Sequence, residues 1–171
     1  TRVVIDALSS PADFTDPLPL GVGALGDIRA SGVTALNWTV SSRDLDTTVS
    51  QIAYAQALVD SDPELWMLVR KYSDIASAAA ADQIAIMLGF QHPEPIGEHG
   101  ERLETFRRLG VRIMQLTYNN RSLFGDGCLE PANGGLSRAG RTLIERMNAL
   151  GVAVDLGHAG MRTTVEAIAA S

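Results

Sequence analysis

The chain has little of several features that mark whole classes of protein. Among its 171 residues there is one cysteine, Cys128, which excludes an intrachain disulfide and is typical of a reducing compartment such as the cytoplasm. No apolar run approaches the roughly 20 residues that cross a bilayer, and no cationic segment precedes an apolar stretch. We therefore expect a cytoplasmic protein with no membrane partner.

Basic clusters and aromatic residues are also scarce. The formal net charge is −6, there is no block of Lys and Arg, and aromatic residues make up 5% of the chain. Nucleic-acid binding depends on a basic surface and often on aromatic stacking, so we expect no nucleic-acid partner. The hydrophobic fraction of 46% and the charged fraction of 20% are typical of an ordinary globular domain.

What the sequence does contain is a set of six short apolar runs, each of which ends on a polar or charged residue. Stretches with helical periodicity lie between these runs, and such β-then-α alternation predicts a parallel sheet with right-handed crossovers. The carboxyl ends of parallel strands open onto one face, where active sites lie. The residues that end the runs are Asp6, Asn37, Arg70, Gln91, Tyr118 and His158.

The pattern predicts six strands and six helices. We expect strands over residues 2–8, 33–40, 65–69, 83–90, 111–117 and 152–156, the first and fourth of them buried. We expect helices over residues 20–30, from about 45 to about 60, and over 75–81, 97–109, 137–150 and 161–170. Ser42 or Asp44 is the expected cap of the second helix, and Ser73 or Asp74 that of the third. His99, near the start of the fourth helix, is expected on the surface.

Two architectures fit this alternation. A doubly wound open sheet suits the length, but the first strand-to-helix turn lacks a glycine-rich phosphate fingerprint. A (β/α)8 TIM-type barrel suits the polar strand ends, although a complete barrel takes about 250 residues. We predict an α/β fold in which the chain covers about the first six strands of such a barrel. Residues 1–171 would then be a single incomplete domain, with the remaining strands expected beyond Ser171 or from another chain.

His158 lies in the strongest local signal, the segment Val154 to Gly160. A strand-end imidazole can bind a metal or act as a general base near neutral pH, and Gly157 allows a close approach to the backbone. The alternative is a histidine that is hydrogen-bonded to a neighbouring loop.

Hydrogen-bonding residues also gather after the fifth expected strand. Tyr118 can donate to an oxyanion or hold a carboxylate, Asn119 can do either through its amide, and Asn120 is a candidate substrate-binding residue. An ordinary turn, for which Asn-Asn is suitable, is the alternative. The glycine-rich segment 119–135 that follows is predicted to be a functional loop covering a pocket.

Gln91 and Asp6 are weaker candidates of the same kind. Gln91 follows the fourth expected strand and is predicted to contact substrate, with His92 beside it as a loop histidine. Asp6 ends the first run and would orient a ligand, or else cap the next turn. Asn37 and Arg70 are weaker still.

Taken in order, several segments resemble the membrane (renal-type) dipeptidase family, and the resemblance spans almost the whole chain. The family consists of barrel hydrolases that carry two zinc ions and cleave dipeptides. The resemblance is carried by Ile5-Asp6-Ala7, Ile86 to Gln91, Leu109 to Arg112, Gln115 to Asn120, and Asn148 to His158.

Carrying the family's roles over to this chain shows several departures. Alignment on Asp6 places Leu8 and Ser10 where the family has a metal-binding His-x-Asp pair. The bridging glutamate falls on Gln91, and the histidine that stabilises the transition state falls on Tyr118. His158 alone keeps its residue type, as the first of two later histidine ligands. The second histidine and the catalytic aspartate would follow Ser171. Since leucine cannot ligate and an amide bridges two cations poorly, a standard dizinc centre is not expected.

Three interpretations follow from the resemblance. The first is a hydrolase of a small amide, peptide or amino-acid derivative, with one divalent metal, zinc, held by His158 and downstream ligands. The second uses Tyr118, Gln91 and Asp6 without metal, and Asn119 assists in both. The third is a catalytically silent protein that binds a small ligand on the same scaffold. Open sheet edges would also permit a homo-oligomer or a structural role.

Overall fold

The computed structural model describes residues 2–98 and 100–171, so the expectation for His99 lies outside the described residues. The chain divides into two compact units. The first contains the residues up to 40 together with 49–89, and the second contains 41–48 and 90–171. None of the described helices has the length and apolar character needed to cross a membrane.

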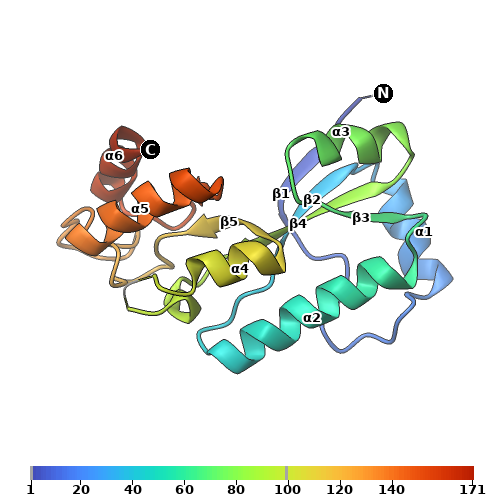
Figure 1. Ribbon diagram of the computed structural model, residues 1–171, viewed down its shortest axis with the longest axis horizontal. Coiled ribbons are helices and arrows are strands. Elements are labelled where there is room, and N and C mark those ends of the chain that lie inside the picture. The colour runs from blue at the N-terminus through green and yellow to red at the C-terminus, as the bar shows by residue number, and fades with distance from the viewer. Residues whose placement is uncertain (1, 99) are drawn as a thin grey trace. The chain divides into compact units, whose positions relative to one another are not determined.

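The first unit is built on parallel strands. Strand β2 (Ala35–Thr39) pairs with β1 (Ile5–Ser9) on one side and with β4 (Ile84–Phe90) on the other. Strand β3 (Trp66–Leu68) pairs with the far side of β4, so that Ala85 lies opposite both Ala35 and Met67. Figure 1 shows these strands together. All seven residues of β4 are buried, which confirms the expectation from its continuous apolar run.

Three helices connect these strands: α1 (Val22–Ala30), α2 (Leu45–Ser61) and α3 (Ser73–Ala80). Helix α2 begins after Asp44, whose Oδ1 accepts a hydrogen bond from the Thr47 amide at 2.7 Å, as expected for a capping residue. The predicted cap of α3 is wrong. Ser73 is already the first helical residue, and Asp74 accepts hydrogen bonds from the amides of Arg70 and Lys71 instead.

The prediction that the first strand is buried is wrong as well. Ile5 is 50% exposed and Leu8 is 48% exposed. The physical reason is that, among the described residues, β1 has a strand partner on one side only, which is β2. The strand also begins later than expected, so Asp6 is its second residue rather than its exit.

The second unit is built around strands β5 (Val111–Gln115) and β6 (Ala153–Asp155), which pair in parallel with Gln115 opposite Asp155. Its helices are α4 (Leu103–Leu109), α5 (Arg138–Leu150) and α6 (Met161–Ala170), with a short 3-10 helix, η1 (Glu94–Ile96). The Ser137 hydroxyl caps α5 by accepting from the Gly140 amide, as the sequence predicts.

Helix α4 is shorter than predicted. The expected helix over 97–109 begins only at Leu103, because Gly97 and Gly100 adopt φ angles of +86° and +64° that no right-handed helix contains. The left-handed Gly110 ends the helix as expected.

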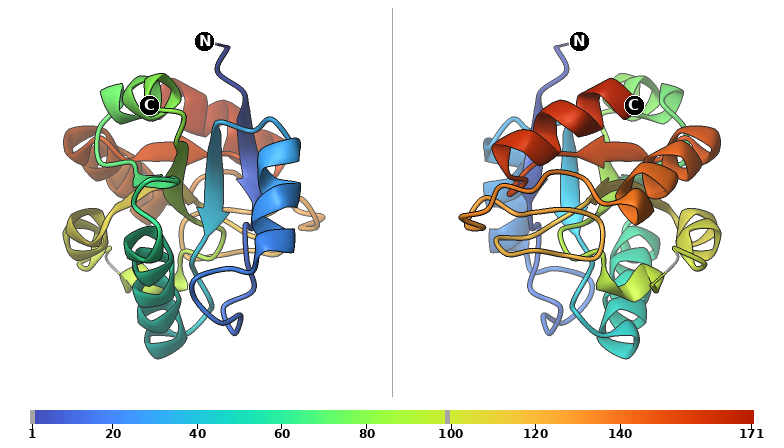
Figure 2. Two further views of the ribbon diagram at one scale, coloured as in Figure 1. Left: turned by 90° about the vertical axis from the view of Figure 1, so that its right-hand side faces the viewer. Right: turned by 90° about the vertical axis from the view of Figure 1, so that its left-hand side faces the viewer.

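A long loop over residues 119–137 joins β5 to α5 without a helix or strand of its own, and Figure 2 shows it in orange. The buried carboxylate of Asp126 organises it. This carboxylate accepts two hydrogen bonds from Arg121, from Nε at 2.6 Å and Nη2 at 3.1 Å, and a third from the Gly134 amide. The Asp126 carbonyl also accepts from the Thr163 hydroxyl of α6. The loop is therefore an ordered structure.

Candidate functional site

Three aromatic rings contact one another in tilted geometry in the second unit, and each comes from the segment after a different strand. Tyr118 contacts both His92 and His158. Its ring centroid is 4.7 Å from that of His92 and 4.2 Å from that of His158, with interplanar angles of 34° and 32°. We call these three side chains the ring column. Tyr118 and His158, which the sequence analysis expects at one face of the sheet, are therefore in contact.

The orientation of His158 is fixed from two directions. Its Nδ1 lies 2.7 Å from Oδ1 of Asn119, and because an amide oxygen can only accept, Nδ1 carries a proton, which in the neutral ring leaves the lone pair on Nε2. The His158 carbonyl accepts a hydrogen bond from the Cys128 amide at 2.7 Å. The residue has a φ of +61°, a left-handed conformation that costs about 1–2 kcal/mol for a non-glycine residue. Such strain is characteristic of functional positions.

The long loop is attached directly to this site through Asn119. The Asn119 carbonyl accepts from the Leu129 amide at 2.9 Å, and the Cys128 thiol lies 3.7 Å from the same Oδ1 that binds His158. Gly127 passes so close to the carbonyl groups of Tyr118 and Asn119 that a Cβ atom would overlap with both. The loop and the ring column therefore support one another.

The sequence analysis predicts only a loop histidine at residue 92, yet the His92 ring is a member of the ring column. The hydroxyl of the buried Ser41 accepts hydrogen bonds from the amides of both Gln91 and His92, each at 3.0 Å. Burial lowers the pKa of His92, Glu94 opposes this shift, and the neighbouring Arg43 and His158 side chains lower the pKa further. His92 is therefore neutral at neutral pH.

A polar pair, the buried Gln115 and the half-buried Asp155, also escaped the sequence reasoning. Gln115 is 2% exposed, its Nε2 donates to Asp155 Oδ2 at 3.4 Å, and its Oε1 has no hydrogen-bond partner among the described residues. The signal that could have revealed it is a glutamine between the apolar residues Met114 and Leu116, at the end of β5.

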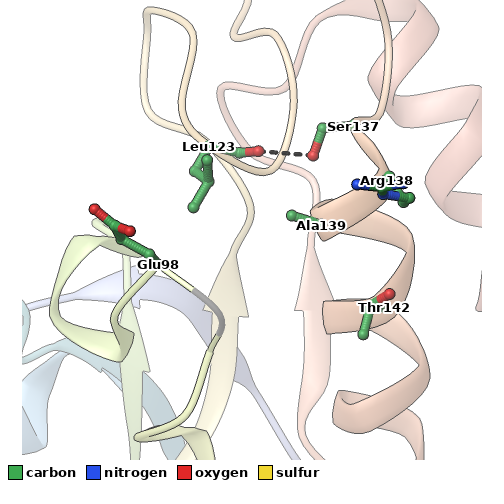
Figure 3. A pocket seen from close by; sticks show the side chains of 6 residues that line it. All are labelled: Glu98, Leu123, Ser137, Arg138, Ala139 and Thr142. Carbon is green, nitrogen blue, oxygen red and sulfur yellow. Dashed lines mark hydrogen bonds between the residues drawn. The ribbon is translucent and has the colours of Figure 1, made fainter.

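Two cavities of the second unit bear on the location of a ligand. One, of about 170 Å³, adjoins the ring column at Tyr118 and is lined also by Arg43, Glu94, Asn119, Asn120, Arg121 and Ser122. The other, of about 480 Å³, lies between Glu98, Leu123 and the start of α5, where Ser137 donates to the Leu123 carbonyl at 2.7 Å (Figure 3). No predicted site residue lines the larger cavity, so the smaller one is the candidate ligand pocket.

All of the predicted site residues except Asp6 belong to the second unit. Tyr118, Asn119 and His158 contact one another, and Asn120 lines the small cavity beside them. Gln91 is partly exposed next to His92. Asp6 belongs to the first unit, where its Oδ1 accepts from the Leu8 amide at 3.0 Å, the turn-capping contact that was the alternative to a ligand role.

Comparison with known proteins places this fold in a class. An amidohydrolase from Pseudomonas aeruginosa superposes over 99% of this chain and 50% of its own, with a TM-score of 0.85 and 33% sequence identity. A metallopeptidase from Rhodobacter sphaeroides, solved with a phosphinate mimic of the dipeptide L-Ala-D-Ala, superposes over 86% of this chain and 52% of its own, with a TM-score of 0.77 and 17% identity. The chain thus has the α/β fold of a TIM-type barrel, of which it forms the early strands.

The sequence comparison then gives the family. The pattern of the membrane dipeptidase family, peptidase family M19, matches residues 25–171, and the chain belongs to that family. The dipeptidase verJ of Clonostachys rogersoniana is 30% identical over 129 residues, which are 74% of this chain and 33% of that protein. The chain therefore spans about a third of the length of this curated relative and about half the length of the solved ones.

Family members are metallopeptidases, and the residues of this chain can be tested against a metal centre. Within residues 2–98 and 100–171, no three His, Cys, Asp or Glu side chains group as metal ligands. Of the predicted donors, His158 alone offers a free imidazole nitrogen, while Leu8 has no donor atom and Gln91 is neutral. The described residues do not fit a complete metal site.

Proposed function

We propose that this chain forms part of the substrate site of a dipeptidase-like hydrolase that acts on a small amide, peptide or amino-acid derivative. The observation that carries the proposal is the ring column together with Asn119. The column places a tyrosine hydroxyl and an imidazole on adjacent rings, beside a pocket whose lining includes the amides of Asn119 and Asn120. Family membership supports the same reaction class.

Each predicted residue has a role in this proposal. Tyr118 and Asn119 donate hydrogen bonds to the carbonyl oxygen of the scissile amide as it becomes an oxyanion. Gln91 and Asn120 contact the substrate, and Asp6 orders the surrounding groups. The loop over 119–137 covers the pocket, in keeping with its hydrogen bonds to His158 and Asn119.

We also propose a single zinc ion as the cofactor and the cytoplasm as the location of the protein. His158 would supply one ligand, through Nε2, to a single zinc ion whose other ligands lie outside the described residues. The alternative is a site that works without metal. The lone Cys128 supports a reducing, cytoplasmic location.

The second candidate is a catalytically silent protein that binds a small ligand on the same scaffold. It is favoured by the residues that replace the family's ligands, because Leu8 and Gln91 cannot do the chemistry of a histidine and a glutamate. Either candidate predicts that small amides or amino acids bind beside Tyr118.

One experiment separates the two candidates. The protein is assayed on a panel of dipeptides, and its zinc content is measured, for the wild type, His158→Asn and Arg108→Gln. Asparagine tolerates the left-handed backbone of His158, so the first variant should fold. The second alters an exposed ion pair on α4. Hydrolysis that is lost in His158→Asn and kept in Arg108→Gln supports the hydrolase, whereas no turnover by the wild type supports the binding protein.

A further inference from the structure

The small pocket beside Tyr118 contains two opposite charges that do not pair with each other. Arg43 and Glu94 both line this cavity of about 170 Å³. Among the described residues, Arg43 forms no ion pair and no hydrogen bond, and the Glu94 carboxylate has only the His92 ring within ion-pair distance, at 3.7 Å. Since burial keeps that ring neutral, each charge lacks a charged partner.

The other groups in the pocket do not cancel this separation. The guanidinium of Arg121 also lines the pocket but is bound to the Asp126 carboxylate through both Nε and Nη2. The Ser122 hydroxyl is engaged with the Leu116 carbonyl. The Asn120 side chain lines the same cavity as a neutral group that can donate and accept. The pocket therefore presents one unpaired positive charge, on Arg43, and one unpaired negative charge, on Glu94. The amides of Asn119 and Asn120 line the same pocket and can bind the ligand as well.

The size of the cavity limits what can occupy it. About 170 Å³ corresponds to roughly six water molecules. A second cavity, of about 340 Å³, shares Glu94, Arg121 and Ser122 with it, so only the part of a ligand between Arg43 and Glu94 is limited by the small cavity. A ligand that satisfies both charges in so little space must carry its own two charges a few bonds apart. The zwitterionic head of a free α-amino acid, with its ammonium and carboxylate on one carbon, has this property.

We propose that Arg43 and Glu94 form a binding site for a free α-amino acid, with the carboxylate on Arg43 and the ammonium on Glu94. A bidentate guanidinium–carboxylate contact and a charge-assisted contact to the ammonium would hold the ligand next to the Tyr118 ring. This site rests on the proposed function, whose pocket beside Tyr118 it uses, and it deepens that proposal by naming the ligand class and the two charged residues that bind it. If the protein is a hydrolase, the site would retain a product and slow its release.

The test is calorimetric titration of the protein with alanine, alanine methyl ester and N-acetylalanine. The ester lacks the carboxylate and the acetyl compound lacks the ammonium. We expect saturable binding of alanine and at least about tenfold weaker binding of each analogue, since each loses a charge-assisted contact. Absence of saturable alanine binding, or equal binding of either analogue, overturns the proposal.

Substitutions test whether Arg43 and Glu94 each contribute to the binding of alanine. Arg43→Gln and Glu94→Gln should each weaken alanine binding by about tenfold or more, and the double exchange Arg43→Glu with Glu94→Arg should recover part of the loss. Both residues are exposed, so the variants should fold. Arg108→Gln and Glu104→Gln, which alter an exposed pair on α4, serve as matched controls. Equal effects in the controls, or none at Arg43 and Glu94, would contradict the assignment.

The outcomes for binding and for hydrolysis are separable. If alanine binds as expected and no dipeptide is cleaved, the amino-acid site stands and the hydrolase proposal fails. If dipeptides are cleaved and alanine affinity is unchanged in the Arg43 and Glu94 variants, the hydrolase proposal stands and the amino-acid site fails.

Discussion

The Nδ1 atom of His158 lies 2.7 Å from the Oδ1 atom of Asn119, and this contact determines which imidazole nitrogen is free. Because the amide oxygen only accepts, it holds a proton on Nδ1, and in the neutral ring Nε2 is then the nitrogen available to a substrate or a metal. The contact links the segment after β5 to the segment after β6, two of the three segments that carry the ring column.

Replacing Asn119 by leucine should therefore release the tautomer of His158. Leucine keeps the approximate volume but cannot accept the Nδ1 proton, so we expect a mixture of tautomers. Any activity or metal affinity should fall about 10- to 100-fold. Nitrogen-15 NMR of the imidazole reports the tautomer directly. Asn120→Leu is the control, and an unchanged His158 signal in Asn119→Leu would show that this hydrogen bond does not set the tautomer.

Gly127→Ala should disturb the site through the backbone. Its Cβ would overlap the carbonyl groups of Tyr118 and Asn119, which cannot rotate away, so we expect a loss of about 1–3 kcal/mol in the free energy of unfolding. The matched control is Gly23→Ala in α1, where no heavy atom lies within 4 Å of the added Cβ. There alanine should stabilise by about 0.5–1 kcal/mol. Urea denaturation measures both, and equal effects would refute the argument.

The periodicity of the sequence was sufficient to predict the order of the strands and helices, because each element depends mainly on its own residues. The buried β4 and the Ser137 cap of α5 are examples in which short-range chemistry decides the outcome. The exposure of β1 could not be read in the same way. Its residues form an apolar run, and the exposure depends on which strands lie beside it.

The candidate site was only partly predictable for a related reason. Tyr118 and His158 could be inferred because each follows a strand, and strand ends share one face. His92 and Arg43 could not, since their place in the site depends on the Ser41 hydroxyl and on how loops pack around a cavity. Sequence spacing carries no record of such loop contacts.

Asp126→Asn should loosen the loop over 119–137. The carboxylate accepts two hydrogen bonds from Arg121 and one from Gly134, and a neutral amide cannot satisfy all of these donors. We expect a lower Tm and faster proteolysis within the loop than in Glu104→Gln, which alters an exposed pair on α4. Matching Tm values and cleavage patterns in the two variants would show that Asp126 does not hold the loop.

The stabilisation from Asp126 should also depend on pH in a defined direction. Hydrogen bonds from Arg121 and from the Gly134 amide lower the pKa of this carboxyl below its ordinary value. The native protein therefore binds the proton less readily than the unfolded chain, whose aspartates titrate near pH 4. The stabilisation is complete above that pH and is lost as the pH falls through the lowered native pKa. We therefore expect the stability difference between wild type and Asp126→Asn to be constant between about pH 7 and pH 5 and to shrink below about pH 4. Denaturant titrations across this range measure it, and a difference that grows on acidification would mean that Asp126 is not bound as an anion.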